Sequence, residues 1–102
     1  MDLREELESV ERIEEWMREG GFSISEAAMS RMVDLFVYDE DIERAMKEPR
    51  YCGIEKRPGG PVFCFTGPDL QGGRIAVGLR LTRKRVIVAA VERLPDPPPE
   101  RN

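Results

Sequence analysis

The sequence contains no histidine, and its only cysteines are Cys52 and Cys64. Two thiols do not complete the four-ligand set of a structural zinc site, and the common catalytic triads need an imidazole. The sequence therefore excludes histidine-based hydrolases and the usual zinc centres. It predicts neither a bound metal nor a cofactor.

Long apolar runs are also missing from the 102 residues. A membrane-spanning helix needs about 20 mostly apolar residues, and a secretion signal needs an apolar segment near its start. The chain instead begins MDLREE, where four of six side chains are charged. We therefore expect a cytoplasmic protein without a membrane segment, and its length suits a single domain.

Charge is divided unequally along the chain. Residues 1–48 carry 15 acidic and 6 basic side chains, whereas residues 49–102 carry 5 acidic and 10 basic ones. Such an asymmetry is typical of a protein with an anionic partner at one end and a cationic partner at the other. It is equally expected if the acidic half consists only of solvated helix faces.

The first 48 residues have the apolar spacing of helices. One helix is predicted within residues 1–20, because apolar side chains recur there every three or four positions. These positions are Leu3, Leu7, Val10, Ile13 and Met17. A helical pair is predicted over 22–48, with Ser23 and Glu26 as a capping box and Asp39 as the second N-cap.

After Pro49 the apolar period changes to two, which is typical of strands. We expect strands at 50–55, 61–66, 74–81 and 85–93. The predicted fold is therefore α+β, with three N-terminal helices packed on a four-stranded antiparallel β-meander. The domain covers residues 1–94, and residues 95–102 form a proline-rich tail that we expect to be extended and disordered.

The two cysteines are predicted to be cross-strand neighbours. If residues 56–60 form the first hairpin loop, Cys52 lies opposite Cys64 and Ile54 opposite Val62. Two small buried thiols in a reducing cytosol and a cross-strand redox pair both fit this arrangement.

Basic residues on the predicted sheet are the candidates for binding RNA or another anion, because guanidinium groups on a rigid sheet bind phosphate well. Several of them belong to the turn between the last two strands, where basic side chains also serve solubility. The candidates are Arg31, Arg50, Arg74, Arg80, Arg83, Lys84 and Arg85, with Arg57 as a further neighbour. No residue is assigned a catalytic role.

A family resemblance supports these candidates. Residues 25–49 contain Ala28, Arg31-Met32, Asp41-Ile42, Ala45 and Pro49, and a glycine precedes a basic, apolar strand. Over residues 22–94 this order resembles a family of small bacterial domains grouped with the RelE and ParE toxin fold. The resemblance implies helices on an antiparallel sheet whose exposed face meets RNA, as an active or inactive ribonuclease. It points to Arg31, Arg74 and Arg80, with Arg50 and Tyr51 as neighbours.

A second hypothesis assigns the function to the acidic helices. A non-enzymatic interaction or inhibitor module would use this surface to bind a basic protein partner or another copy of the chain. The candidate contacts lie on the first helix, which could also form a homodimer. They are Glu8, Glu11, Glu15 and Trp16. A plain structural subunit is the third alternative.

Overall fold

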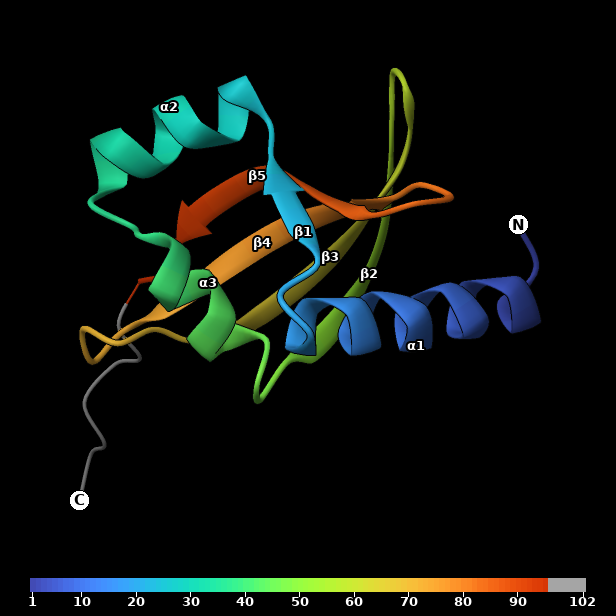
Figure 1. Cartoon of the computed structure of the whole chain (residues 1–102), viewed down its shortest axis with the longest axis horizontal. Helices are drawn as coiled ribbons and strands as arrows, with labels where there is room; N and C mark the ends of the chain where they lie inside the picture. Colours follow the sequence, from blue (N-terminus) through green and yellow to red (C-terminus); the bar gives the residue numbers. More distant parts are fainter. Residues whose placement is uncertain (96–102) are drawn as a thin grey trace.

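A computed structural model describes residues 1–95 as an α+β fold in which three helices accompany one sheet (Figure 1). The helices are α1 (Leu3–Arg18), α2 (Glu26–Leu35) and α3 (Asp39–Ala45). The strands are β1 (Phe22–Ile24), β2 (Arg50–Arg57), β3 (Gly60–Pro68), β4 (Arg74–Leu81) and β5 (Val86–Arg93). The predicted proline-rich tail lies outside the described residues, except for Pro95.

The sheet has five strands in the order β1-β5-β4-β3-β2, and it is mixed. The antiparallel meander of β2 to β5 is as predicted, but β1 adds a parallel strand beside β5, with Phe22 opposite Val86 and Ile24 opposite Val88. The prediction of a four-stranded antiparallel sheet is therefore wrong in this detail. β5 therefore lies between two strands, and its backbone has hydrogen-bonding partners on both edges.

The start of α2 explains why β1 escaped prediction. Ser25, not Ser23, is the N-cap, and its hydroxyl accepts a hydrogen bond from the Ala28 amide at 3.1 Å. The predicted cap lies two residues too early, so it assigned the strand residues Ser23 and Ile24 to the helix. The helix ends at Leu35, and Phe36 is its C-cap.

The cap of α3 also differs from the prediction by one residue. Tyr38 holds the N-cap position, and its backbone amide donates to a carboxylate oxygen of Asp41 at 2.9 Å. Asp39 is instead the first helical residue, where its charge still suits the helix dipole. Ile42 and Ala45 of α3 and Met46 at its C-cap are buried in the core.

The hydrophobic core lies on one face of the sheet, between the strands and the helices. Alternate strand residues such as Phe63, Phe65 and Leu79 pack there against Ile13 of α1 and Met32 of α2. Only the second half of the predicted α1 stripe is buried. Val10, Ile13 and Met17 are in the core, whereas Leu3 and Leu7 are exposed. Within residues 1–95, no helix is both long and apolar enough to cross a membrane.

The hairpin of β2 and β3 contains a bulge that changes its register. Gly53 lies opposite Cys64 and Ile54 opposite Phe63, while Tyr51 lies opposite Phe65, so Cys52 is the extra residue. The predicted pairing of Cys52 with Cys64 is therefore wrong by one residue. The connecting turn is shorter than expected, because Arg57 already pairs with Gly60.

Candidate functional site

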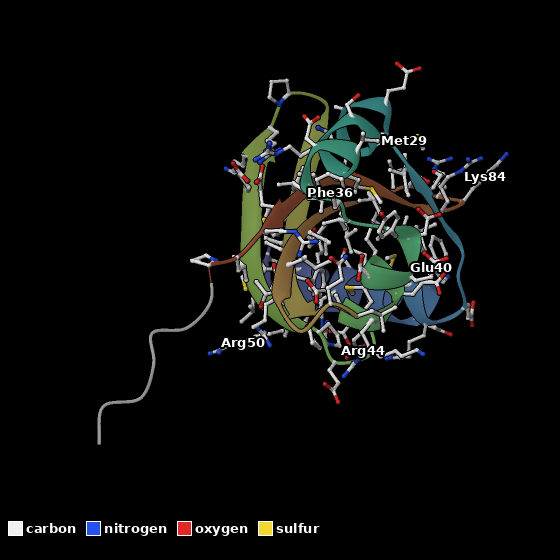
Figure 2. The ribbon with its side chains drawn as sticks, turned by 90° about the vertical axis from the view of Figure 1, so that its left-hand side faces the viewer. Met29, Phe36, Glu40, Arg44, Arg50 and Lys84 are labelled. Carbon is white, nitrogen blue, oxygen red and sulfur yellow. The ribbon has the colours of Figure 1, made fainter. Side chains whose placement is uncertain are left out.

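The face of the sheet opposite the core is the candidate site, and we call it the outer face. In Figure 2 the helices lie to the right of β2 and β3, and no helix of the described residues covers the left side of these strands. The strand register determines which side chains belong to this face. They are Arg50, Glu55, Arg57, Val62, Cys64, Thr66, Arg74, Ala76, Gly78, Arg80, Ile87, Ala90 and Glu92, together with the bulged Cys52.

Arg50 and Arg74 flank Thr66 at one end of the outer face. Arg50 is directly opposite Thr66 on the neighbouring strand, and an Arg74 Nη2 donates to Thr66 Oγ1 at 3.4 Å. Two strand spacings and two residues separate the arginine α-carbons, which corresponds to about 12 Å. Among residues 1–95, neither guanidinium has a carboxylate partner. Both are therefore available to an anion.

Arg80 shares the outer face but lies away from Arg74. Six residues of β4 separate the two arginines, or about 20 Å. The Arg80 side chain is half-buried and folds over the β2–β3 turn, where its Nη2 donates to the Pro58 carbonyl at 2.9 Å. Its Nε is buried and has no hydrogen-bond partner within the described part of the chain. The predicted arginines therefore do not form one compact cluster.

Two of the predicted basic residues are paired with carboxylates. Arg31 on α2 makes a two-pronged contact with Glu92, in which Nε and Nη2 donate at 2.9 and 2.8 Å. This hydrogen bonding, with the opposite charge, raises the pKa of Arg31 and lowers that of Glu92. Arg57 pairs with Glu55 at 2.9 Å. Both arginines are partly neutralised by these carboxylates, so they attract a phosphate less strongly than an unpaired arginine does.

Arg83, Lys84 and Arg85 form the exposed tip of the β4–β5 hairpin. The Thr82 hydroxyl accepts hydrogen bonds from the Lys84 and Arg85 amides at 3.2 and 3.0 Å, which fixes the turn. Lys84 and Arg50 lie on opposite sides of the molecule (Figure 2). The hairpin tip is therefore a separate basic surface.

The two thiols are free and lie beside the Arg50–Arg74 end. The exposed Cys52 contacts Thr66 Oγ1 through its Sγ at 3.9 Å. Burial raises the pKa of the Cys64 thiol, with a further contribution from Glu55, so its reactive thiolate form is disfavoured. In residues 1–95, no three histidine, cysteine or acidic side chains gather as a metal site.

Tyr51 is not on the outer face. Its ring packs among core aromatics, with centroids 5.2 Å from Phe65 and 6.5 Å from Phe63. Burial, and then the charge of Glu6, raise the pKa of its hydroxyl to about 12. Tyr51 is therefore a core residue next to Arg50 in sequence but on the other side of the sheet.

The candidate contacts of the acidic surface lie along α1. Glu8, Glu11 and Glu15 are exposed, whereas Trp16 is half-buried and packs against the core. The Arg12 guanidinium carbon is 6.0 Å from the centre of the Trp16 ring. The aromatic side chain thus docks this helix on the domain, and the exposed acids form the outward surface.

The sequence reasoning missed a polar network at the end of the sheet. Buried Asp69 accepts hydrogen bonds from the Gln71 and Gly73 amides at 2.8 Å and from Arg93 Nη1 at 2.9 Å. Arg93 also donates to the Leu35 and Phe36 carbonyls, which caps the C-terminus of α2. An aspartate before a Gln-Gly-Gly turn is a local signal for the first two bonds. Nothing in the sequence indicates the third.

No protein-family model, no curated protein and no solved structure matches this chain. The site is therefore interpreted from its own geometry.

Proposed function

We propose that the chain is a small RelE-like protein that binds single-stranded RNA through the outer face of its sheet. One observation carries this proposal. Arg50 and Arg74 stand on either side of Thr66 on the outer face, and neither has a carboxylate partner among residues 1–95. The resemblance of residues 22–94 to RelE-type domains points in the same direction.

The spacing of the two arginines supports contacts with a phosphate backbone. Long, flexible side chains that start about 12 Å apart can meet at one phosphate or hold two neighbouring ones. The Thr66 hydroxyl between them offers a further donor to a phosphate oxygen. Ala76, which lies opposite Thr66 on β4, is small, so the chain of an RNA can approach the sheet closely there. Glu92, which pairs with Ala76 from β5, is occupied by Arg31.

The composition of the outer face indicates how such binding would work. All the aromatic residues of the sheet lie on or toward the core face, as Tyr51, Phe63 and Phe65 illustrate. Without an aromatic platform, bases are not held by stacking, which supplies much of the affinity in other single-strand binders. The proposed binding is therefore electrostatic, weak and largely independent of base sequence.

Binding without cleavage is the form of activity that the side chains favour. Among residues 1–95, the strand register places one carboxylate, Glu92, at this end of the face, and Arg31 holds its pKa below the usual range. A carboxylate that stays ionised and occupied is a poor general acid. The thiol of Cys64 is likewise held in its protonated form by burial. We therefore propose an RNA-binding rather than an RNA-cleaving protein.

The test is fluorescence anisotropy of a labelled oligouridine over a salt series. Each contacted phosphate contributes about −0.7 to the slope of log affinity against log salt, so two contacts give about −1.4. Arg50→Gln and Arg74→Gln should each weaken binding and make the slope shallower by about 0.7. Arg44→Gln, which changes an arginine on α3 away from the outer face, is the matched control.

Two results would contradict the proposal. One is the absence of binding at low salt, which would leave the acidic helices as the working surface. The other is binding that is lost in Lys84→Gln and kept in Arg74→Gln, which would move the RNA contact to the hairpin tip.

A further inference from the structure

We infer that a second surface, separate from Arg50 and independent of RNA binding, docks an amphipathic protein helix with basic margins. This surface is an apolar groove beside α2, and we call it the α2 groove. It is lined by Met29, Met32, Val33, Phe36, Val37 and Tyr38, with Asp39 at its end, and its volume is about 420 Å³.

Three apolar side chains of the α2 groove are largely exposed, whereas Met32 and Val37 at its base belong to the core. Val33 and Phe36 keep 70% of their surface in contact with solvent, and Met29 keeps 53%. Met29 and Val33 lie one helical turn apart on the same side of α2, and Phe36 follows at the end of the helix. Exposed apolar side chains that adjoin one another mark interaction surfaces, whereas scattered ones do not.

Phe36 is held in a backbone conformation that an aromatic residue rarely adopts. It caps α2 with φ 55° and ψ 42°, in the left-handed region where helices usually end with glycine. Its carbonyl accepts hydrogen bonds from Gln71 Nε2 at 2.9 Å and Arg93 Nη2 at 3.0 Å. Gln71 and Arg93 thus hold the backbone of Phe36 in place, although its exposed ring contributes little to the core. A contact outside this chain accounts for both the strain and the exposure.

Acidic side chains border the α2 groove. Glu26 is exposed one turn before Met29 on α2, and Asp39 and Glu40 are exposed at the start of α3. In Figure 2, Glu40 lies below Met29 and Phe36. The one basic residue of α2, Arg31, lies on another side of the helix and is bound to Glu92. The border therefore presents negative charge to whatever covers the groove.

The negative charge of this border favours a basic partner over the other molecules that could cover an apolar groove. A second copy of the chain, docked groove to groove, would bring two acidic borders together, and an anionic membrane would be repelled in the same way. A helix with an apolar ridge and flanking lysine or arginine residues satisfies both the groove and its border. The spacing of Met29, Val33 and Phe36 over two turns suits a partner helix of two to three turns.

The test measures peptide binding to the full chain by fluorescence anisotropy. The probe is a labelled 14-residue leucine–lysine peptide with an amphipathic helical pattern. The controls are a leucine–glutamate peptide of the same pattern and a scrambled leucine–lysine peptide. We expect the first to bind at least tenfold more tightly than either control.

Phe36→Gly is the decisive variant, because a left-handed φ suits glycine and the change relieves strain instead of unfolding the chain. It should be as resistant to urea as the parent and bind the leucine–lysine peptide at least tenfold more weakly. Val33→Ser should act in the same direction. Leu7→Ser, which changes an exposed leucine on α1, should leave the affinity unchanged.

Three results would overturn the inference. One is equal binding by Phe36→Gly and the parent, and another is equal binding of the acidic peptide. The third is a dimer in sedimentation that dissociates in Phe36→Gly, which would make a second copy the occupant. Oligouridine binding should not change in Phe36→Gly. The peptide assay and the RNA assay therefore test the two proposals independently.

Discussion

At the scale of single residues, Asp69 is the charge on which the polar network depends. Burial alone would raise the pKa of its carboxyl group, but hydrogen bonds from the Gly73 and Gln71 amides and from Arg93 outweigh burial and lower it. The side chain is fully shielded from solvent, whereas that of Arg93 is 31% exposed. The carboxylate therefore orders the β3–β4 turn and holds the arginine that caps α2.

This arrangement predicts how stability depends on pH. The pKa of Asp69 is lower in the folded chain than its unfolded value of about 3.9, so its contribution is complete above that value. The contribution is lost as the pH falls through the folded pKa. Asp69→Asn should cost about 2 kcal/mol of unfolding free energy at pH 7, and this difference from the parent should narrow below about pH 4. Urea unfolding across pH measures it.

The control for Asp69→Asn is Glu11→Gln, which changes an exposed carboxylate on α1. Its unfolding free energy should follow that of the parent at every pH. A cost for Asp69→Asn that stays constant down to pH 2.5 would show that the residue acts through shape and not through charge.

The sequence predicts on which face of the sheet an arginine lies, but not whether that arginine is paired. The alternation of β4 correctly placed Arg74 and Arg80 on one face, because period two follows from strand geometry alone. Whether an arginine is free or paired depends on residues far away in sequence. Arg31 meets Glu92 across 61 positions, and Arg80 meets the Pro58 carbonyl across 22. Such contacts leave no local signal.

At the scale of elements, β3 and α3 approach each other closely at Gly67. A β-carbon at Gly67 would lie 2.8 Å from the Ala45 α-carbon and would also clash with the Ala45 carbonyl. Since backbone atoms cannot move aside as a flexible side chain can, α3 would have to shift away from the sheet. The absence of a side chain at Gly67 therefore sets the position of this helix.

Gly67→Ala should lower the unfolding free energy by about 1–3 kcal/mol, as overpacking does in other cores. The midpoint of urea unfolding measures this change. Gly21→Ala is the matched control, because its β-carbon would have only the Trp16 carbonyl oxygen nearby, at 3.7 Å, and should change stability by about 0.5 kcal/mol or less. Equal midpoints for the two variants would mean that α3 can move from β3 without cost.

The elements themselves were largely predictable, and the exceptions have a common cause. The bounds of β4 and the buried positions of α3 follow from apolar spacing. β1 has three residues, which is too short for a period of two to stand out, and its pairing with β5 depends on residues more than 60 positions away. The bulge at Cys52 likewise leaves no pattern, because one inserted residue can be accommodated anywhere along a strand.

At the scale of the whole molecule, the uneven charge of the sequence becomes a division of surfaces. The acidic residues of 1–48 lie mainly on the exposed sides of the helices, and Arg50 and Arg74 lie on the outer face of the sheet. The two proposed binding activities therefore use different sides of one small domain. A single core between helices and sheet connects them, so both depend on the same folding unit.

Whether α1 belongs to the same folding unit as the sheet can be measured at Ile13. Ile13 is fully buried among residues from the sheet and the other helices, whereas Leu7 on the same helix is 50% exposed. Ile13→Ala should therefore cost about 3 kcal/mol in urea unfolding, and Leu7→Ala should cost about 0.5 kcal/mol or less. The opening free energy measured by hydrogen exchange of the β4 amides should fall by the same amount in Ile13→Ala, because loss of the helix contact loosens the core that α1 shares with the sheet. Unchanged exchange in β4 would instead mean that α1 opens without the sheet and is free to pair with another subunit.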